Sequence, residues 1–207
     1  GGIAGTSVIK GSPLEFLHRT AMDAEISSDK VRSIADKAKN TAKFPSSQLG
    51  GSLGLVSRLI AGGMPTRIYY VSQGGYDTHT NQRSSQDRLH KDLGDSVKAF
   101  VDDLKAQGNF GRVTLMTFSE FGRRVGENLS GGTDHGSASV MFAVGQRLKG
   151  GLHGKYPSLA PADLKQGDLV YTTDFRGVYA GLIEDCLGAP SAPILGKQIK
   201  PLHLLRA

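Results

Sequence analysis

Two short apolar runs, each followed at once by a polar cluster, constrain the fold of this chain of 207 residues more than any other feature. The first run is RIYYVS, from Arg67 to Ser72, and QGGYDTHTNQ follows it. The second is RVTLMTF, from Arg112 to Phe118, and it leads into SEFGRRVGENLSGGTDHG. Continuous apolar runs rich in β-branched and aromatic residues predict buried strands.

Helical periodicity lies between these runs and on both sides of them. Between them, apolar residues recur at spacings of four and three, which predicts a long amphipathic helix from about Ser84 to Gln107. These residues are Leu89, Leu93, Val97, Val101 and Leu104. Further helices are expected from Ser12-Pro13 to about Asn40, from about Ser52 to Ala61, and from Thr173-Asp174 to Gly188. A third apolar run, SASVMFAVG at 137–145, predicts another strand.

Strands of this type that alternate with long helices favour an α/β fold, with a mainly parallel sheet flanked by helices on both faces. We expect residues 1–207 to form a single domain of this kind. Ligands of such folds bind outside the carboxyl ends of the strands. The two polar clusters would therefore open on the same edge of one sheet.

Composition excludes several classes of function. The formal net charge is +6, but the chain has neither a run of basic residues nor a basic stripe interleaved with aromatic residues, so nucleic-acid binding is not indicated. Hydrophobic residues make up 38% of the chain, which is enough for a sizeable core. No stretch approaches the roughly 18 apolar residues that would indicate a membrane span.

The polar clusters contain residue types that bind divalent metal ions. Asp77 and His79 are two positions apart, so in an extended segment their side chains point the same way. Glu120 follows the second apolar run, and Asp134 and His135 lie in a glycine-flanked turn. Carboxylates mixed with imidazoles suit zinc, manganese and similar ions, and two-metal hydrolases use such sets. These five residues are the predicted metal ligands, although Asp134 could instead orient His135.

Neighbouring residues admit both functional and structural interpretations. Arg123 and Arg124 could bind an anionic substrate through their guanidinium groups, or could be ordinary surface charges. Glu120 could instead accept hydrogen bonds from loop N–H groups. His153, in GGLHGKYPS, is a weaker ligand candidate, and Asp174 is typical of a helix cap.

Three motifs together resemble a known family. They are YYVSQGGYDTHTNQ, TLMTFSEFGRRVGENLSGGTDHG and TTDFRGVYAGLIEDCLG, and the resemblance covers roughly Leu14 to Leu205. The family is domain-of-unknown-function family 1501, which is regarded as related to the alkaline phosphatase and sulfatase superfamily. This resemblance implies a metal-dependent hydrolase of phosphate or sulfate esters that uses Zn, Mn, Ca or Mg. It also implies a bacterial protein exported to the periplasm or cell envelope.

The metal ligands of the superfamily can be aligned with this sequence in two ways. In the first, Asp134 and His135 match the superfamily's Asp-His pair and His153 matches its last histidine. In the second, which we prefer, Glu120 replaces the Asp of that pair and His135 becomes the last histidine. Phe121 then stands where the superfamily has a His, so that one metal site would be altered or lost.

The superfamily also carries a metal-binding Asp and a Ser or Thr nucleophile on strands near its N-terminus. This chain starts with predicted helices, so the resemblance implies an alkaline-phosphatase-like domain that is N-terminally incomplete and inactive as this fragment. The alternative is a catalytically degenerate relative that serves as a binding or assembly module of the cell envelope. Missing strands would leave sheet edges exposed, which favours self-association.

Overall fold

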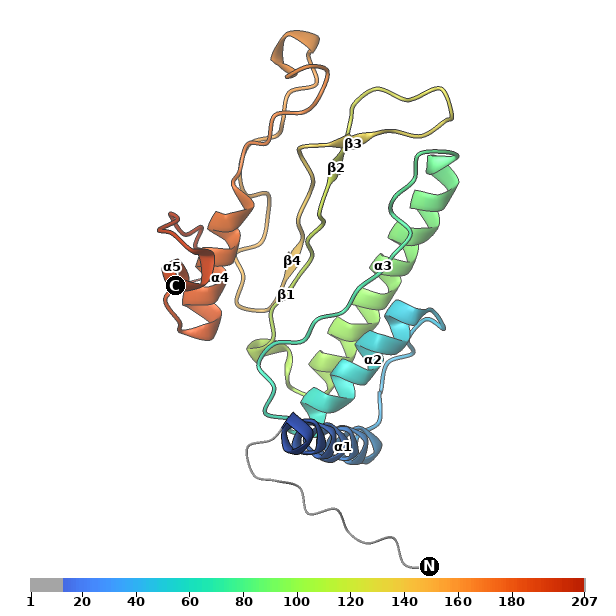
Figure 1. Cartoon of the computed structure of the whole chain (residues 1–207). Helices are drawn as coiled ribbons and strands as arrows, with labels where there is room; N and C mark the ends of the chain where they lie inside the picture. The colour runs from blue at the N-terminus through green and yellow to red at the C-terminus, as the bar shows by residue number, and fades with distance from the viewer. Residues whose placement is uncertain (1–12, 207) are drawn as a thin grey trace, which may run out of the picture.

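The computed structural model describes residues 13–206, and its elements are arranged around an irregular extended layer, with α2 and α3 on one side and α4 and α5 on the other (Figure 1). The α-helices are α1 (Pro13–Lys37), α2 (Gln48–Ala61), α3 (Gln82–Ala106), α4 (Phe175–Leu187) and α5 (Ser191–Leu195). The short 3-10 helices are η1 (Phe110–Arg112) and η2 (Pro161–Asp163). The strands are β1 (Leu115–Met116), β2 (Gly122–Arg123), β3 (His135–Gly136) and β4 (Ala143–Val144). The predicted cap Ser12 lies outside the described residues.

Helices α2 and α3 form the main core. Leu49, Leu53 and Ile60 of α2 cluster with Phe100 and Leu104 of α3, and all five are buried. The apolar spacing that predicted a long helix before Gly108 is therefore confirmed by α3. Helix α2 begins earlier than its predicted start because the Ser47 hydroxyl caps it, accepting a hydrogen bond of 3.0 Å from the N–H of Gly50.

A buried carboxylate ties the segment after α1 to this core. Asp103 of α3 has no exposed surface, and its oxygens accept hydrogen bonds from Ser57 Oγ at 2.6 Å and Asn40 Nδ2 at 2.7 Å. They also accept from the backbone N–H groups of Thr41 and Ala42. Burial alone would raise the pKa of Asp103, but these hydrogen bonds outweigh it and hold the pKa well below its ordinary value. The carboxylate therefore stays ionised inside the core.

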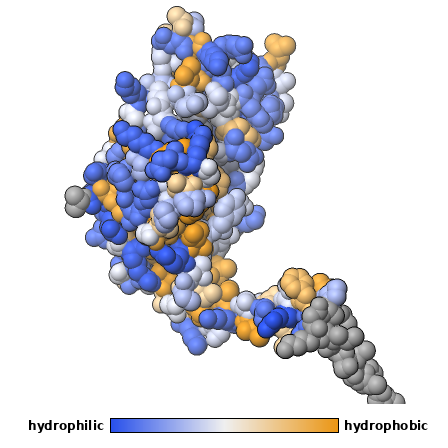
Figure 2. All heavy atoms as spheres, turned by 60° about the vertical axis from the view of Figure 1, so that its left-hand side comes forward, coloured by the Kyte–Doolittle hydropathy of each residue, from blue (hydrophilic) through white to orange (hydrophobic). Residues whose placement is uncertain are grey.

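The first apolar run, residues 67–72, is extended but does not pair as a β-strand with any other described residues. Tyr69 and Val71 pack against the α2–α3 core, whereas Ile68 and Tyr70 are 69% and 75% exposed. The run therefore has one covered face and one open face, rather than the two covered faces that its apolar character predicted. Figure 2 shows one face of the molecule, on which hydrophilic residues predominate and apolar residues lie among them.

The prediction of a mainly parallel sheet flanked by helices on both faces is wrong. Within residues 13–206 the strands form two sheets, each of two short antiparallel strands, and helices make up most of the regular structure. The second and third apolar runs form one long, interrupted hairpin, in which Leu115 of β1 lies opposite Val144 of β4. Further out, Arg123 of β2 lies opposite His135 of β3.

The reason lies in the connection between the two runs. Parallel strands need a crossover of roughly a dozen residues or more, usually a helix that packs on the sheet. Residues 119–136 are long enough but carry no helical periodicity, so the chain turns back and the runs pair as an antiparallel hairpin. An alkaline-phosphatase-like sheet is therefore not the architecture of the described residues.

Helix α4 forms a second, smaller core with the segments around Leu148 and Leu204. Leu148, Val178 and Leu204 are buried together, which places the last residues of the described chain across α4. Gly181 permits this approach, because a Cβ atom at that position would lie 2.1 Å from the carbonyl oxygen of Leu202. Asp174 accepts a hydrogen bond from the N–H of Arg176, so its prediction as a helix cap is confirmed.

Within residues 13–206, no helix has the length and apolar character needed to cross a membrane.

Candidate metal centre

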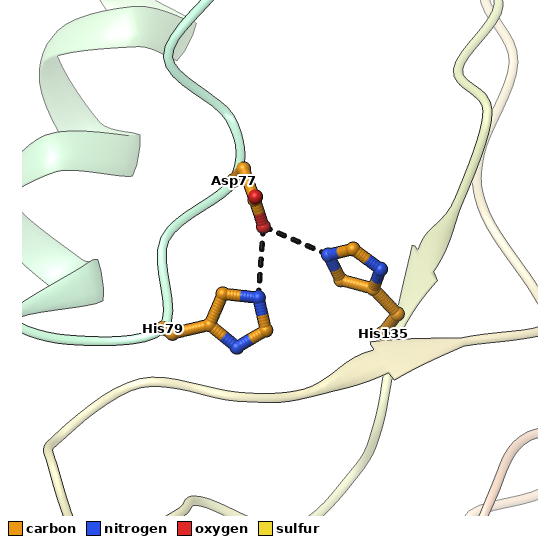
Figure 3. Close-up of side chains that lie close together, drawn as sticks. All are labelled: Asp77, His79 and His135. Carbon is orange, nitrogen blue, oxygen red and sulfur yellow. Dashed lines mark hydrogen bonds and ion pairs between the residues drawn. The ribbon is translucent and has the colours of Figure 1, made fainter.

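Three predicted ligands converge where the loop after the first apolar run meets the outer part of the hairpin (Figure 3). Oδ1 of Asp77 lies 2.9 Å from Nε2 of His79 and 2.8 Å from Nε2 of His135. The candidate ligand atoms of the three residues all lie within 4.8 Å of one another. The side chains are 62%, 46% and 46% exposed, so a solute can reach them. One carboxylate oxygen and two imidazole nitrogens thus face a common point.

The hairpin reaches this loop because its tip lies against the start of α3. The side-chain amide of Asn128 donates a hydrogen bond of 3.0 Å to the carbonyl oxygen of His79. Gly132 is buried at the contact, where a Cβ atom would lie 2.3 Å from both the carbonyl carbon and the carbonyl oxygen of His79. The N–H of Gln82, at the start of α3, donates to the carbonyl oxygen of Gly131. These contacts fix His79 relative to the hairpin.

Asp134 lies on the far side of the His79 ring. Its Oδ1 atom is 3.4 Å from Nδ1 of His79, so the two ring nitrogens of His79 face Asp134 and Asp77 respectively. Histidines that bind a metal through one nitrogen commonly donate the other N–H to a carboxylate, which fixes the tautomer and the ring orientation. Asp134 occupies the position of such an orienting carboxylate.

A stack of side chains supports the other histidine. The ring of Phe121 lies parallel to that of His135, with a centroid separation of 3.9 Å and an interplanar angle of 7°. The guanidinium carbon of Arg123 lies 5.0 Å from the centroid of the Phe121 ring. This stack limits rotation of His135 and covers one face of its ring.

Arg123 also connects the hairpin to the loop that carries Asp77 and His79. Its Nη1 atom donates to the carbonyl oxygen of Thr133 at 2.5 Å, and Nη2 donates to the carbonyl oxygen of Tyr76. Nη2 lies 3.6 Å from Oδ1 of Asp77, and the side chain is only 18% exposed. The guanidinium group is therefore largely engaged with the protein itself.

The electrostatics favour an ionised Asp77. The hydrogen bond with His135 is the largest cause that lowers the pKa of this carboxyl, and the charges of His79, His135 and Arg123 add to it. Desolvation acts in the opposite direction but does not prevail. An ionised carboxylate is the protonation state that a metal ion requires of this ligand.

The remaining candidates lie outside this cluster. Glu120 is exposed and makes no side-chain hydrogen bond or ion pair with another residue of 13–206. The side chain of Arg124 is also exposed, while its backbone N–H donates to Asp134. Nε2 of His153 lies 2.9 Å from the carbonyl oxygen of Lys149, in another part of the chain. The structure brings together Asp77, His79 and His135, with Asp134 adjacent.

Comparison with known proteins identifies the family. A family model described as a protein of unknown function, DUF1501, matches residues 15–176. The chain belongs to this family. The matched range contains Asp77, His79, Asp134 and His135, so the whole cluster lies within the part of the chain that the DUF1501 model describes. The chain matched no curated protein and no solved structure.

Several residues that shape the candidate site were not among the predicted site residues. Asn128 accepts from the N–H groups of Ser130 and Gly132 through its side-chain oxygen, which closes the turn at the hairpin tip. The sequence Asn-Leu-Ser-Gly-Gly carries the asparagine and glycine signal of such a turn. Asp168 holds the other end of β3, because its Oδ2 atom accepts from the N–H of Ser137 at 2.8 Å. No local pattern distinguishes Asp168 from an ordinary surface aspartate.

Proposed function

We propose that this chain is a metal-dependent hydrolase-like domain that acts on phosphate or sulfate esters. Asp77, His79 and His135 are its metal ligands, and Asp134 orients His79. The observation that carries the proposal is the convergence of Oδ1 of Asp77 with Nε2 of both histidines, at 2.8–2.9 Å.

The donor set favours zinc over magnesium or calcium. Mg²⁺ and Ca²⁺ prefer oxygen ligands, whereas two imidazoles and one carboxylate suit Zn²⁺ or another transition metal. Catalytic zinc sites commonly use three protein ligands and keep a further position open. The high exposure of all three side chains supports an open position of this kind.

A bound divalent cation would supply Lewis acidity that polarises an oxygen of a phosphoryl or sulfuryl group. The protein's own contribution is positioning. Asp134 holds the His79 ring, and Phe121 stacks on His135, so both Nε2 atoms keep their direction toward Asp77. Arg124, the exposed member of the arginine pair, is the better placed of the two to meet an anionic substrate from solvent.

The alternative is a binding or assembly module of the cell envelope, and Phe121 favours it. Phe121 cannot bind a metal, and it stacks directly on a candidate ligand, at the position where the superfamily resemblance expects a second histidine. The extended run 67–72, with Ile68 and Tyr70 exposed, offers an edge through which such a module could self-associate.

The two candidates are separated by measuring bound metal and hydrolysis on the same samples. The purified protein is loaded with Zn²⁺ or Mn²⁺, desalted, and assayed for metal by mass spectrometry and for hydrolysis of p-nitrophenyl phosphate and p-nitrophenyl sulfate. We expect about one retained ion per chain and hydrolysis that requires it. Hydrolysis would overturn the inactivity that the superfamily resemblance implies for this fragment, and it is expected because the three proposed ligands all lie within this chain. His135→Ala should abolish both, whereas His153→Ala, a histidine outside the cluster, should change neither.

Each outcome decides between the candidates. Metal retention that is lost in His135→Ala, without hydrolysis of either ester, would reject the hydrolase and support the binding module. Equal metal retention by His135→Ala and the wild-type protein would reject the proposed metal centre itself.

A further inference from the structure

We propose that a basic hollow between the C-terminal segment and α4, lined by Arg147, Lys149, His203 and Arg206, is a second anion site that binds a phosphate-type dianion. The hollow has a volume of about 400 Å³, and Asp185 and Leu205 complete its lining. Its lining comes from α4, the segment after β4 and the C-terminal segment. Helix α4 and the C-terminal segment lie away from the β2–β3 end of the hairpin, which carries the metal centre (Figure 1).

Backbone pairing builds the hollow from two distant parts of the chain. The N–H of Lys149 donates to the carbonyl oxygen of Leu204 at 2.7 Å. The N–H of Arg206 donates to the carbonyl oxygen of Arg147 at 2.8 Å. Leu148 and Leu204 are buried in the second core beneath this pairing. The positions of the basic residues are therefore set by ordered backbone rather than by loose side chains.

Two of the polar groups are held in place by the protein. Nε of Arg206 donates to the carbonyl oxygen of Leu148 at 3.0 Å, which anchors the guanidinium group at the rim. Nδ1 of His203 lies 3.0 and 3.1 Å from the two carboxylate oxygens of Asp185. With Nδ1 directed at Asp185, the opposite ring nitrogen, Nε2, is left for a ligand. Groups oriented in advance lose less entropy when they bind.

The charges in this hollow are not balanced. Arg147, Lys149 and Arg206 make no ion pair with any residue of 13–206. Asp185 supplies the one negative charge in the lining, and it is engaged by His203. Like charges gathered in one hollow repel one another, and a multivalent anion would relieve that repulsion.

The chemistry of the lining indicates a tetrahedral dianion. Guanidinium groups bind phosphate oxygens through paired N–H donors, and lysine adds a compact positive charge. The hollow is shallow and open to solvent, so a small organic group attached to the phosphate could extend outward from it. Inorganic phosphate and the phosphate of a small monoester are the two sources of this chemistry.

The test measures phosphate binding in a His135→Ala background, so that anions held at the metal centre do not contribute. Inorganic phosphate and glycerol phosphate are titrated by calorimetry at low ionic strength, and the His203 ring is followed by NMR. We expect saturable binding and a shift of the His203 signals. Adding Arg147→Gln and Lys149→Gln together should weaken binding about tenfold or more. The matched pair Lys37→Gln and Lys39→Gln, which removes two charges near the end of α1, should change it by less than about twofold.

Comparing inorganic phosphate with glycerol phosphate distinguishes the two sources. If glycerol phosphate binds more tightly, the organic group is part of the natural ligand.

Three outcomes would overturn the proposal. The first is no saturable binding of either anion. The second is equal weakening by the two double variants, which would indicate a diffuse effect of net charge. The third is binding to anionic lipid vesicles that the Arg147 and Lys149 variants abolish while phosphate itself does not bind. All four substituted residues are exposed, so the fold should be retained, and circular dichroism verifies this.

Discussion

Oδ1 of Asp77 lies 2.8 Å from Nε2 of His135, although the two residues are 58 positions apart in the chain. This contact joins the loop after the first apolar run to the returning arm of the hairpin, and His79 meets the same oxygen from the loop side. The candidate metal centre therefore exists only while the hairpin tip stays docked on that loop. The first prediction tests this docking.

Gly132→Ala should weaken metal binding by moving His79. A Cβ atom at position 132 would lie 2.3 Å from the carbonyl group of His79, a distance that the backbone cannot accommodate without shifting. We expect at least a tenfold rise in the dissociation constant for Zn²⁺ measured by calorimetry, since displacing one of three ligands removes much of the site. Gly126→Ala, in the same hairpin with no atom within 4 Å of the added Cβ, is the matched control and should bind normally. Equal affinities for the two variants would show that the contact does not position His79.

Asp134→Asn should weaken metal binding without removing a ligand. Asp134 lies 3.4 Å from Nδ1 of His79, and loss of such an orienting carboxylate typically lowers metal affinity roughly 10- to 100-fold. Glu127→Gln removes an acidic charge from the same hairpin and should have little effect. If both variants lower affinity equally, the role of Asp134 is general electrostatic attraction rather than orientation of His79.

Arg123→Lys should loosen the site even though it preserves the positive charge. A lysine cannot reproduce the fork of N–H donors that Arg123 directs at the carbonyl oxygens of Thr133 and Tyr76. We expect faster amide hydrogen exchange in residues 119–136 and a several-fold loss of zinc affinity. Arg124→Lys, at an exposed side chain, should leave both measurements unchanged. Unchanged amide hydrogen exchange in Arg123→Lys would show that the hydrogen bonds of Arg123 do not hold the hairpin against the loop.

Asp103→Asn should destabilise the fold in a way that depends on pH. The carboxylate is fully buried and accepts from Ser57 and Asn40, so replacement should lower the free energy of unfolding by about 3 kcal/mol near neutral pH. The folded-state pKa of Asp103 lies below its ordinary value of 3.8, so its contribution is complete above that value and is lost as the pH falls toward the folded-state pKa. The difference between the two proteins should therefore be constant above about pH 5 and shrink below about pH 4.

Urea titrations at several pH values measure this difference. Asp95→Asn is the control, because Asp95 pairs with Lys91 on the exposed surface of the same helix, where an ion pair contributes little. A difference for Asp103→Asn that stays constant down to pH 2 would show that the ionised carboxylate is not what stabilises the fold.

The helices could be predicted from the sequence because each carries its own periodic apolar face. Leu93 and Leu104 lie on the stripe that predicted α3; Leu104 is buried against α2, and Leu93 packs against the same core. Asp103 lies beside Leu104, and nothing in its neighbourhood in the sequence indicated that a carboxylate would be buried there. Its partners Asn40 and Ser57 come from other parts of the chain, so their role depends on tertiary packing.

The strands could not be placed correctly because strand pairing is not local. The run Arg112–Phe118 has the composition of a buried strand in either a parallel sheet or a hairpin, and only the missing crossover helix after it favours the hairpin. Asp77, His79 and His135 were nevertheless predicted to meet. They do so at the contact between a hairpin and a loop, rather than at the carboxyl edge of a parallel sheet. Glu120, which the sheet would have placed beside them, lies apart for the same reason.

We propose that Asp77, His79 and His135 hold one divalent ion together. X-ray absorption at the zinc edge of the zinc-loaded protein tests it most directly, because the spectrum reports the type and distance of the atoms bound to zinc. We predict two imidazole nitrogens at about 2.0–2.1 Å with oxygen completing the coordination, and the loss of one imidazole in His135→Ala. A spectrum without imidazole, or one that His135→Ala leaves unchanged, would contradict the claim.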